Sequence, residues 1–144
     1  MYLFWPLLKI CTFSKKFFSG SQWKVKDLTY KISKYPTTHK LSVGEVDIEI
    51  AKALKVWAEV TDLTFEQRWS GQVHIDIRFD NGEHGDGDPF DGMGGTLAHA
   101  YFPVYRGDAH FDNSEYWTIN SGTNMLQTAA HEFGHSLGLS HSDQ

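Results

Sequence analysis

The sequence contains a single cysteine, Cys11, among its 144 residues. One cysteine cannot form a disulfide within the chain, and it cannot build a thiolate-rich zinc site. No Asn-x-Ser/Thr acceptor for N-glycosylation occurs, so that sign of secretion is missing. The apolar residues 1–10 are too few to span a membrane and have no basic segment before them, which makes them an unconvincing signal peptide. Any zinc bound by this chain must therefore use histidine and carboxylate ligands.

Positive charge is also scarce, with 13 Lys and Arg against 18 Asp and Glu, a formal net charge of -5 and a pI near 5.8. No cluster of basic residues interleaves with aromatics, so we expect no nucleic-acid partner. The sequence has no internal repeat or low-complexity tract, and 40% of its residues are hydrophobic. Length and composition together predict one globular domain.

Hydrophobic periodicity predicts an amphipathic helix that follows a first strand. Leu28, Tyr30 and Ile32 alternate with polar residues, as in a half-buried strand. Ser42 and Glu45 form the capping-box pattern of a helix start. The expected core positions of this helix follow at helical spacing: Val46, Ile50, Ala53, Leu54, Trp57 and Val60.

The remaining pattern predicts further strands, a long loop and a last helix. We expect strands at residues 64–69 and 73–79, then short ones near 97–102 and 109–112. Between them lies a loop rich in Gly and Asp, residues 80–96, of the kind that carries function or metal. The last helix should begin near Asn124 and bury Leu126, Ala129, Ala130, Phe133 and Leu137. These elements predict a mixed sheet with a helix laid across it.

The last helix carries the motif His131-Glu132-Phe133-Gly134-His135. Residues four apart on an α-helix lie about 40° apart around the axis and about 6 Å along it, so both imidazoles can reach one ion. Gly138 can take a left-handed conformation that ends the helix and returns His141 to the same ion as a third ligand. A fourth position is then left for water, as in catalytic zinc sites, and Glu132 is placed to act as the base.

A second group of possible zinc ligands lies earlier in the chain and consists of His84, Asp86, His99 and His110. Three imidazoles and one carboxylate would close a tetrahedral site with no open position, which would make this zinc structural. The spacing alone is equally compatible with ordinary surface histidines.

Oxygen-rich residues near this group suggest calcium. Asp91, Asp112 and Glu115 offer carboxylates, and Gly92 and Gly94 offer backbone carbonyls. The spacing does not match an EF-hand loop, which excludes that kind of calcium site.

The sequence from about Trp23 onward resembles the catalytic domain of the matrix metalloproteinases, the matrixins of the metzincin clan. The motifs that carry the resemblance are Leu-Thr-Tyr at 28–30, Ala-Leu-Lys-Val-Trp at 53–57, Leu-Thr-Phe at 63–65, His-Gly-Asp at 84–86, Pro-Phe-Asp-Gly at 89–92, Leu-Ala-His-Ala at 97–100, Gly-Asp-Ala-His-Phe-Asp at 107–112 and the eleven-residue zinc motif. The resemblance implies an α+β fold with a twisted, mixed five-stranded sheet, a long amphipathic helix and an active-site helix.

The resemblance also implies cofactors and partners. It assigns a catalytic zinc to His131, His135 and His141, and a structural zinc to the second group. It assigns at least one calcium to Asp91, Gly92, Gly94, Thr96, Asp112 and Glu115. Extended peptide segments of protein substrates would dock along Leu97 and Ala98. Protein inhibitors are implied as further partners, and the implied location is extracellular.

The chain departs from the family pattern at several places. His74 replaces an Asp of many members, and residues 103–106 form a shorter loop. Both departures weaken the expectation of a second calcium, to which Asp108 would contribute. Residues 1–22 form a divergent segment, signal-like or a gene-model artefact, before a catalytic domain at 23–144. The sequence ends soon after His141, before the family's methionine turn, so we expect a fragment or an incomplete gene model.

The leading hypothesis is a zinc-dependent endopeptidase that hydrolyses extracellular matrix or other extracellular proteins through a zinc-bound water activated by Glu132. One alternative is a catalytically inactive, metal-stabilised fragment that binds peptides. Another is a calcium- or zinc-binding protein that is not a peptidase.

Overall fold

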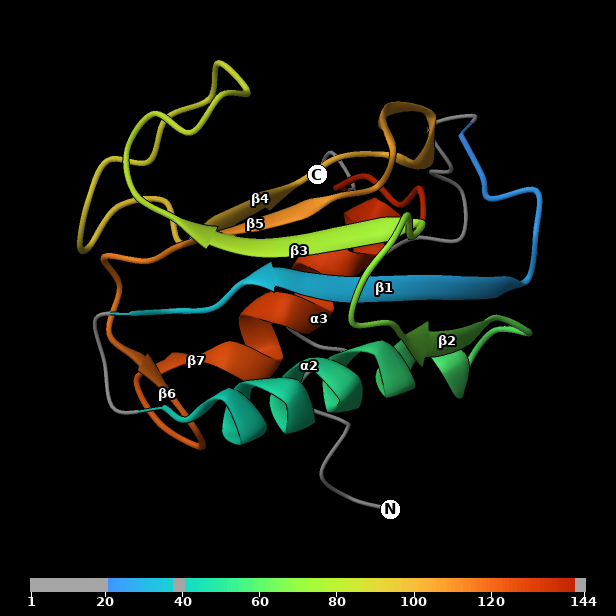
Figure 1. Cartoon of the computed structure of the whole chain (residues 1–144), viewed down its shortest axis with the longest axis horizontal. Coiled ribbons are helices and arrows are strands. Elements are labelled where there is room, and N and C mark those ends of the chain that lie inside the picture. Colours follow the sequence, from blue (N-terminus) through green and yellow to red (C-terminus); the bar gives the residue numbers. More distant parts are fainter. Residues whose placement is uncertain (1–20, 38–40, 142–144) are drawn as a thin grey trace.

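A five-stranded sheet forms one layer of the protein in the computed structural model, which describes residues 21–37 and 41–141 (Figure 1). The strand order is β2-β1-β3-β5-β4, and β4 alone runs antiparallel to its neighbour, β5. The expectation of an α+β fold with a mixed sheet is confirmed. The elements of the sheet are β1 (Asp27–Lys34), β2 (Thr64–Gln67), β3 (Ile75–Asp80), β4 (Ala98–Ala100) and β5 (Ala109–Asp112).

The alternation seen in the sequence decides which side of the sheet is buried. Leu28, Tyr30 and Ile32 of β1 are buried, as are Ile75 and Ile77 of β3. The residues between them, such as Lys31, are at least partly exposed because successive side chains of a strand point to opposite faces. The strands predicted at 64–69, 73–79 and 97–102 are present as β2, β3 and β4, and each is shorter than predicted.

Helix α2 (Val43–Ala58) begins at the predicted capping box. The Ser42 hydroxyl accepts a hydrogen bond from the Glu45 amide, and the Glu45 carboxylate accepts one from the Ser42 amide. Both bonds satisfy amides that a helix start leaves without a partner. The prediction that Val60 belongs to the core is wrong: the helix ends at Ala58, and Val60 is 65% exposed.

Helix α3 (Met125–Ser136) packs against α2, and both helices share one core with the sheet (Figure 1). The Trp57 indole donates a hydrogen bond of 2.8 Å to the Ala130 carbonyl and so joins the two helices directly. Ala129 and Phe133 of α3 are fully buried, as predicted. Met125 is fully buried as well, whereas the predicted Leu126 is only partly buried against the core.

The long loop predicted at residues 80–96 is present at 81–97, where it projects from the end of β3 and returns to β4 (Figure 1). The pattern gave no sign of three shorter elements: the 3-10 helix η1 (Pro103–Tyr105) and the two-stranded pair β6 (Trp117–Thr118) and β7 (Thr123–Asn124). None of the helices in the described part of the chain is both long and apolar enough to cross a membrane. The predicted divergent segment at residues 1–22 falls almost wholly outside the described residues, so the domain division stays a prediction.

Candidate active site and metal centres

Helix α3 carries the first candidate site near its carboxyl end. The Asn124 side chain caps the helix start by accepting a hydrogen bond of 2.9 Å from the Gln127 amide. Because Ala129 and Phe133 face the core, the rings of His131 and His135 are turned out of it and are only partly buried. Their ring centroids lie 5.1 Å apart, one helical turn along the axis.

The chain reverses after α3 at Gly138, as the sequence predicted. The Gly138 amide donates to the His135 carbonyl at 2.9 Å, and the Leu139 amide donates to the Gly134 carbonyl at 2.9 Å. This pair of bonds is the Schellman motif, and the φ of +104° at Gly138 places that residue in a backbone region open mainly to glycine. The helix end is therefore built to turn the chain back on itself.

The reversal brings His141 to the two helical histidines. Its ring centroid lies 4.9 Å from that of His131 and 4.7 Å from that of His135. One nitrogen from each ring lies within 4.8 Å of the other two, so the three side chains form a group that could hold a metal ion. The predicted triad is thus gathered at one point, and we refer to these three residues as the histidine tripod.

Hydrogen bonding and burial prepare the tripod for a cation. His135 Nδ1 lies 2.7 Å from the Leu139 carbonyl oxygen, to which it donates, so Nε2 carries the lone pair that a metal would bind. Burial, with smaller contributions from the other two rings, lowers the pKa of His131 to about 4. Burial also lowers the pKa of His135. Neutral imidazoles near pH 7 are the form that binds zinc, and the residues fit that ion.

Glu132 follows His131 directly on α3 and is 8% exposed. Burial raises the pKa of its carboxyl group to about 7. A carboxyl group with a pKa near the working pH can both accept and return a proton, which is what general acid–base chemistry at neutral pH requires.

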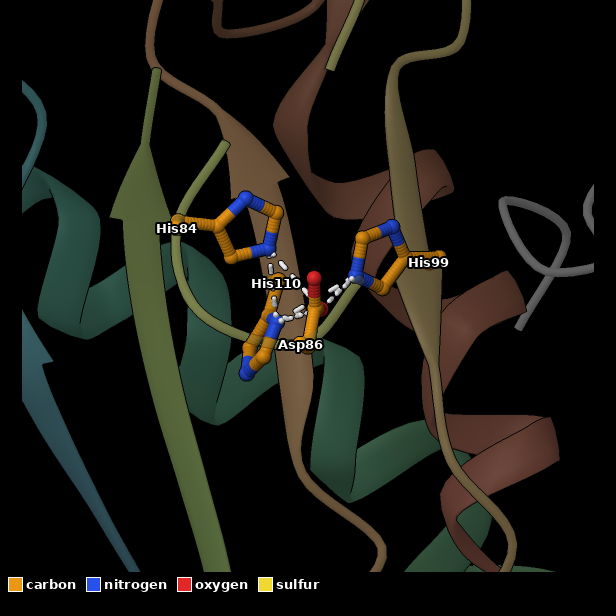
Figure 2. A group of neighbouring side chains, drawn as sticks. All are labelled: His84, Asp86, His99 and His110. Atoms are coloured by element: carbon orange, nitrogen blue, oxygen red, sulfur yellow. Dashed lines mark hydrogen bonds and ion pairs between the residues drawn. The ribbon is translucent and has the colours of Figure 1, made fainter. Parts of the chain in front are cut away.

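The second predicted group, which we call the Asp86 cluster, is also gathered in space, from the long loop, β4 and β5 (Figure 2). Its members are His84, Asp86, His99 and His110. Asp86 Oδ2 lies 2.9 Å from His84 Nε2, 2.8 Å from His99 Nε2 and 3.0 Å from His110 Nδ1. His110 Nδ1 lies 3.1 Å from His84 Nε2 and 3.2 Å from His99 Nε2. Zinc–ligand bonds of about 2.0 Å place the ligand atoms of a tetrahedral site roughly 3.3 Å apart, so this arrangement fits zinc.

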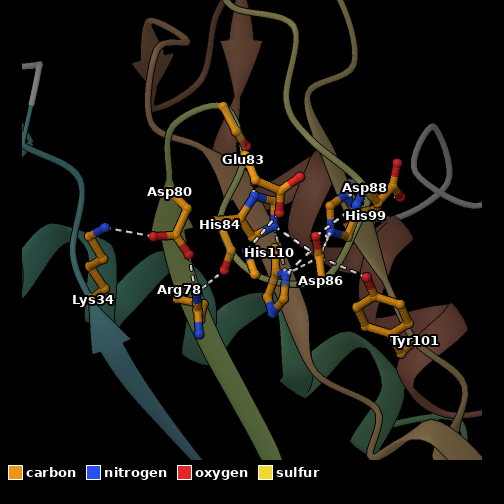
Figure 3. Close-up of polar contacts among 12 residues, drawn as sticks. Lys34, Arg78, Asp80, Glu83, His84, Asp86, Asp88, His99, Tyr101 and His110 are labelled. Atoms are coloured by element: carbon orange, nitrogen blue, oxygen red, sulfur yellow. Dashed lines mark hydrogen bonds and ion pairs between the residues drawn. The ribbon is translucent and has the colours of Figure 1, made fainter.

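Neighbouring groups orient the Asp86 cluster (Figure 3). His84 Nδ1 donates to the Gly82 carbonyl at 2.8 Å, which leaves the lone pair on Nε2, and Arg78 donates to the His84 carbonyl at 3.0 Å. The Phe90 ring stacks on His84 at 4.9 Å and on His99 at 4.8 Å. Ordinary surface histidines would lack these fixed partners, so the geometry favours a metal site.

Hydrogen bonds also keep the Asp86 carboxyl group in its ionised form. Burial acts to raise the pKa of this carboxyl group, but hydrogen bonds from the Tyr101 hydroxyl, the Asp88 amide and the histidines outweigh it and hold the pKa well below its usual range. Asp86 is therefore ionised whenever the histidines are neutral, which is the combination that a zinc ion requires.

The residues expected to bind calcium are only partly gathered. Asp112 is fully buried, and its Oδ2 has no hydrogen-bond partner among the described residues, which is the kind of orphaned acceptor that a cation would satisfy. Glu115 instead accepts a hydrogen bond from the Gly94 amide at 2.8 Å, and Asp91 accepts one from the Thr96 amide at 3.0 Å. Within the described chain these three carboxylates do not form a group with ligand atoms all within 4.8 Å.

Asp108 and the expected docking strand can also be placed. Asp108 accepts a hydrogen bond of 2.9 Å from the Asp76 amide, and burial is the main cause that raises its pKa. It lines an open cavity of about 450 Å³ together with His74 and Asp76. Ala98 lies in β4, the edge strand of the sheet next to β5, and Leu97 immediately precedes this strand. Because α3 packs against β4, the strand passes close to the helix that carries the tripod.

Sequence reasoning missed three residues that contact these sites. Phe90 and Tyr101 contact the Asp86 cluster, and the Trp23 indole donates a hydrogen bond of 2.8 Å to the Ser136 carbonyl at the end of α3. For Tyr101 a signal was available, because it follows His99 by two residues and a strand repeats its facing every two residues. The bond from Trp23 joins residues 113 apart, and no local pattern reveals it.

The fold and site together define a zinc-metallopeptidase type of domain. The defining features are a mixed sheet, a helix with two histidines one turn apart, a buried glutamate on that helix, and a glycine turn that returns a third histidine. The family model for Matrixin matches residues 22–144. This chain belongs to the matrixin family, as its resemblance in sequence predicted.

Individual relatives agree with this assignment. The chain is 56% identical to Stromelysin-3 of Xenopus laevis over 128 residues, which cover 86% of this chain and 26% of the relative. It is 51% identical to Matrix metalloproteinase-20 of Homo sapiens over 124 residues, covering 84% of this chain and 25% of the relative. It is 51% identical to Interstitial collagenase of Bos taurus over 125 residues, which cover 85% of this chain and 26% of the relative. The chain spans about a quarter of the length of these relatives.

Proposed function

We propose that this protein is a zinc-dependent endopeptidase whose active site is the histidine tripod together with Glu132. The observation that carries the proposal is the convergence of one nitrogen each from His131, His135 and His141. The buried Glu132 is next to His131 on the same helix. Three protein ligands leave one position of a tetrahedral zinc for water or substrate, which distinguishes a catalytic site from a structural one.

In this proposal the three histidines and Glu132 have different roles. His131, His135 and His141 hold the zinc, which when bound would polarise the scissile carbonyl and lower the pKa of a coordinated water to about 7. Glu132 accepts the proton of the attacking water and later returns it to the leaving amine. The raised pKa of Glu132, about 7, supports this double role.

Substrate binding follows from the sheet. We place the substrate as an extended segment along the outer edge of β4, at Leu97 and Ala98, where its backbone would add to the sheet by strand addition. Main-chain pairing of this kind accepts many sequences, so the class of substrate is extended, accessible segments of proteins. Contact between α3 and β4 supports this placement, because it keeps the docking edge close to the zinc helix.

Further metals would stabilise the same domain. We assign a structural zinc to His84, Asp86, His99 and His110, on the strength of their near-tetrahedral separations. We also propose at least one calcium near Asp112, with Asp91, Gly92, Gly94, Thr96 and Glu115 as its other ligands. The orphaned Oδ2 of Asp112 supports this site. Asp108 is a candidate ligand of a second calcium.

Location and partners are proposed from the relatives. Two of them are named Matrix metalloproteinase-20 and Interstitial collagenase, so we propose that this protein cleaves extracellular matrix or other extracellular proteins. Protein inhibitors that occupy the same edge and zinc site are the expected partners besides substrates.

Cleavage of a quenched-fluorescence peptide by the zinc-loaded chain tests the proposal. Glu132→Gln should retain zinc at the tripod but lower the cleavage rate at least a hundredfold, since general acid–base catalysis contributes roughly 10²–10⁴-fold. Glu59→Gln, the same change on an exposed residue at the end of α2, is the matched control and should cleave at the normal rate. Equal rates in the first variant and the unmutated chain would show that Glu132 is not the base.

The alternative is a catalytically inactive, metal-stabilised module that binds peptides along β4. It differs from the leading proposal in one result of the same experiment. Zinc-loaded chain that binds the peptide without cleaving it would favour the inactive module, and turnover abolished by Glu132→Gln would exclude it.

A further inference from the structure

Asp86 Oδ2 has more neighbours than its three histidine partners account for. The Tyr101 hydroxyl donates a hydrogen bond of 2.7 Å to this oxygen, the same atom that faces His84, His99 and His110 (Figure 3). The other carboxylate oxygen, Oδ1, accepts a hydrogen bond of 3.0 Å from the Asp88 amide. The two oxygens of Asp86 are therefore distinguished by their partners.

Zinc in the Asp86 cluster would change these contacts unequally. Each imidazole would direct a lone pair to the ion, so none of the three ligand nitrogens could donate a proton to Asp86. The Tyr101 hydroxyl does not compete with zinc, because a carboxylate oxygen has a second lone pair for it. Of the hydrogen bonds described at Asp86, those from Tyr101 and the Asp88 amide would persist.

Tyr101 is itself held in place. Its amide donates to the Asp108 carbonyl at 3.0 Å. Its ring meets those of His99 and His110 edge-on, with centroids 5.6 Å and 5.7 Å away. A phenol fixed at both its backbone and its ring presents the hydroxyl to Asp86 in a single direction.

We propose that Tyr101 is a positioning residue that holds Asp86 as a one-oxygen ligand with Oδ2 toward the ion, and that it thereby sets the zinc affinity of the Asp86 cluster. This inference rests on the structural zinc in the proposed function. Hydrogen-bonded partners of metal ligands typically contribute about 10–100-fold to metal affinity. Without the hydroxyl, the Asp86 carboxylate could rotate or offer both oxygens, and the four-ligand geometry would lose its pre-formed shape.

The experiment compares Tyr101→Phe with two matched variants in the full chain. Tyr35→Phe removes a tyrosine–aspartate hydrogen bond of 2.6 Å, to Asp47, and neither residue belongs to the tripod or to the Asp86 cluster. Tyr105→Phe removes a hydroxyl from a residue that is 67% exposed. The measurement is the zinc dissociation constant from competition with a chromophoric chelator, so it does not depend on catalysis.

Two sites on one chain must first be told apart. The titration phase that belongs to the Asp86 cluster is the one abolished by His84→Ala. His135→Ala, which removes the tripod phase instead, gives the same assignment if the first variant does not fold. Tyr101→Phe removes a single oxygen atom and should leave the fold intact, which circular dichroism of the zinc-loaded chain would check.

Tyr101→Phe is expected to raise the zinc dissociation constant of this phase at least tenfold, with the tripod phase unchanged. Tyr35→Phe and Tyr105→Phe are expected to leave both phases unchanged. Equal affinity of Tyr101→Phe and the unmutated chain would overturn the inference, as would an equal loss in Tyr35→Phe, which would indicate a general effect on stability. A chain with no zinc in the cluster at all would refute the structural zinc itself, a separate failure.

Discussion

Replacing Gly138 by alanine should damage the histidine tripod without touching any ligand. Gly138 has a φ of +104°, where a side chain strains the backbone by roughly 1–3 kcal/mol. An added Cβ would also overlap the Ser21 carbonyl oxygen, so the turn would have to move as well as strain. Because His141 follows this turn by three residues, its ring would leave the common point that it shares with His131 and His135.

The expected result is a loss of about 1–3 kcal/mol in the free energy of unfolding, together with at least tenfold weaker zinc binding at the tripod. Urea unfolding measures the first quantity and chelator competition the second. Zinc in the Asp86 cluster should bind as before, because those ligands lie on β4, β5 and the long loop.

Gly44→Ala is the matched control for Gly138→Ala. Gly44 lies in the first turn of α2 with an ordinary φ, and a Cβ there would meet only the Ser42 hydroxyl, at 4.0 Å. The same substitution should therefore stabilise the protein by roughly 0.5–1 kcal/mol, since glycine in a helix is less favourable than alanine. If Gly138→Ala keeps both full stability and full tripod affinity, the turn does not position His141 and the reasoning is wrong.

Two further substitutions test the contacts that support the sites. Burial acts to raise the pKa of Asp80, but hydrogen bonds from Lys34 and Arg78 outweigh burial and lower that pKa. The ionised Asp80 carboxylate therefore stabilises the fold at pH values above its unfolded pKa of about 3.9, and this stabilisation is lost as pH falls toward its folded pKa. Asp80→Asn should therefore lower the free energy of unfolding by about 1–2 kcal/mol at pH 6. Urea unfolding should show this difference shrinking as pH falls below about 5, and a difference that stays constant would contradict the ion-pair account. Trp23→Phe removes the hydrogen bond to the Ser136 carbonyl and should cost about 1 kcal/mol in urea unfolding, whereas an unchanged unfolding midpoint would show that this bond does not hold the end of α3.

Local patterns in the sequence were enough to predict the elements that carry the proposed active site. The capping box at Ser42 and Glu45 located the start of α2, and the four-residue spacing of His131 and His135 placed both rings on one side of α3. Gly138 correctly predicted the turn that returns His141 to the other two histidines. Each of these features depends on residues within about one or two helical turns of each other, so the sequence states them directly.

Contacts between distant segments could not be inferred in this way. Lys34 and Asp80 are 46 residues apart, and nothing near either residue indicates their pairing. The raised pKa of Glu132 depends on how tightly the surrounding core closes over it, which no local pattern specifies. Val60 continued the helical pattern of α2, but the helix ended two residues earlier and left it exposed. Periodicity thus identifies which face is apolar, whereas the packed structure decides where the element stops.

The proposed activity depends above all on three imidazoles, from α3 and the turn after it, that bind one zinc ion. Anomalous scattering at the zinc absorption edge, from crystals of the chain grown with zinc, tests this binding most directly. We predict a zinc peak about 2.0–2.1 Å from one nitrogen each of His131, His135 and His141, with a fourth coordination position not filled by this chain. A folded chain in which the three rings surround no common zinc peak would contradict the claim.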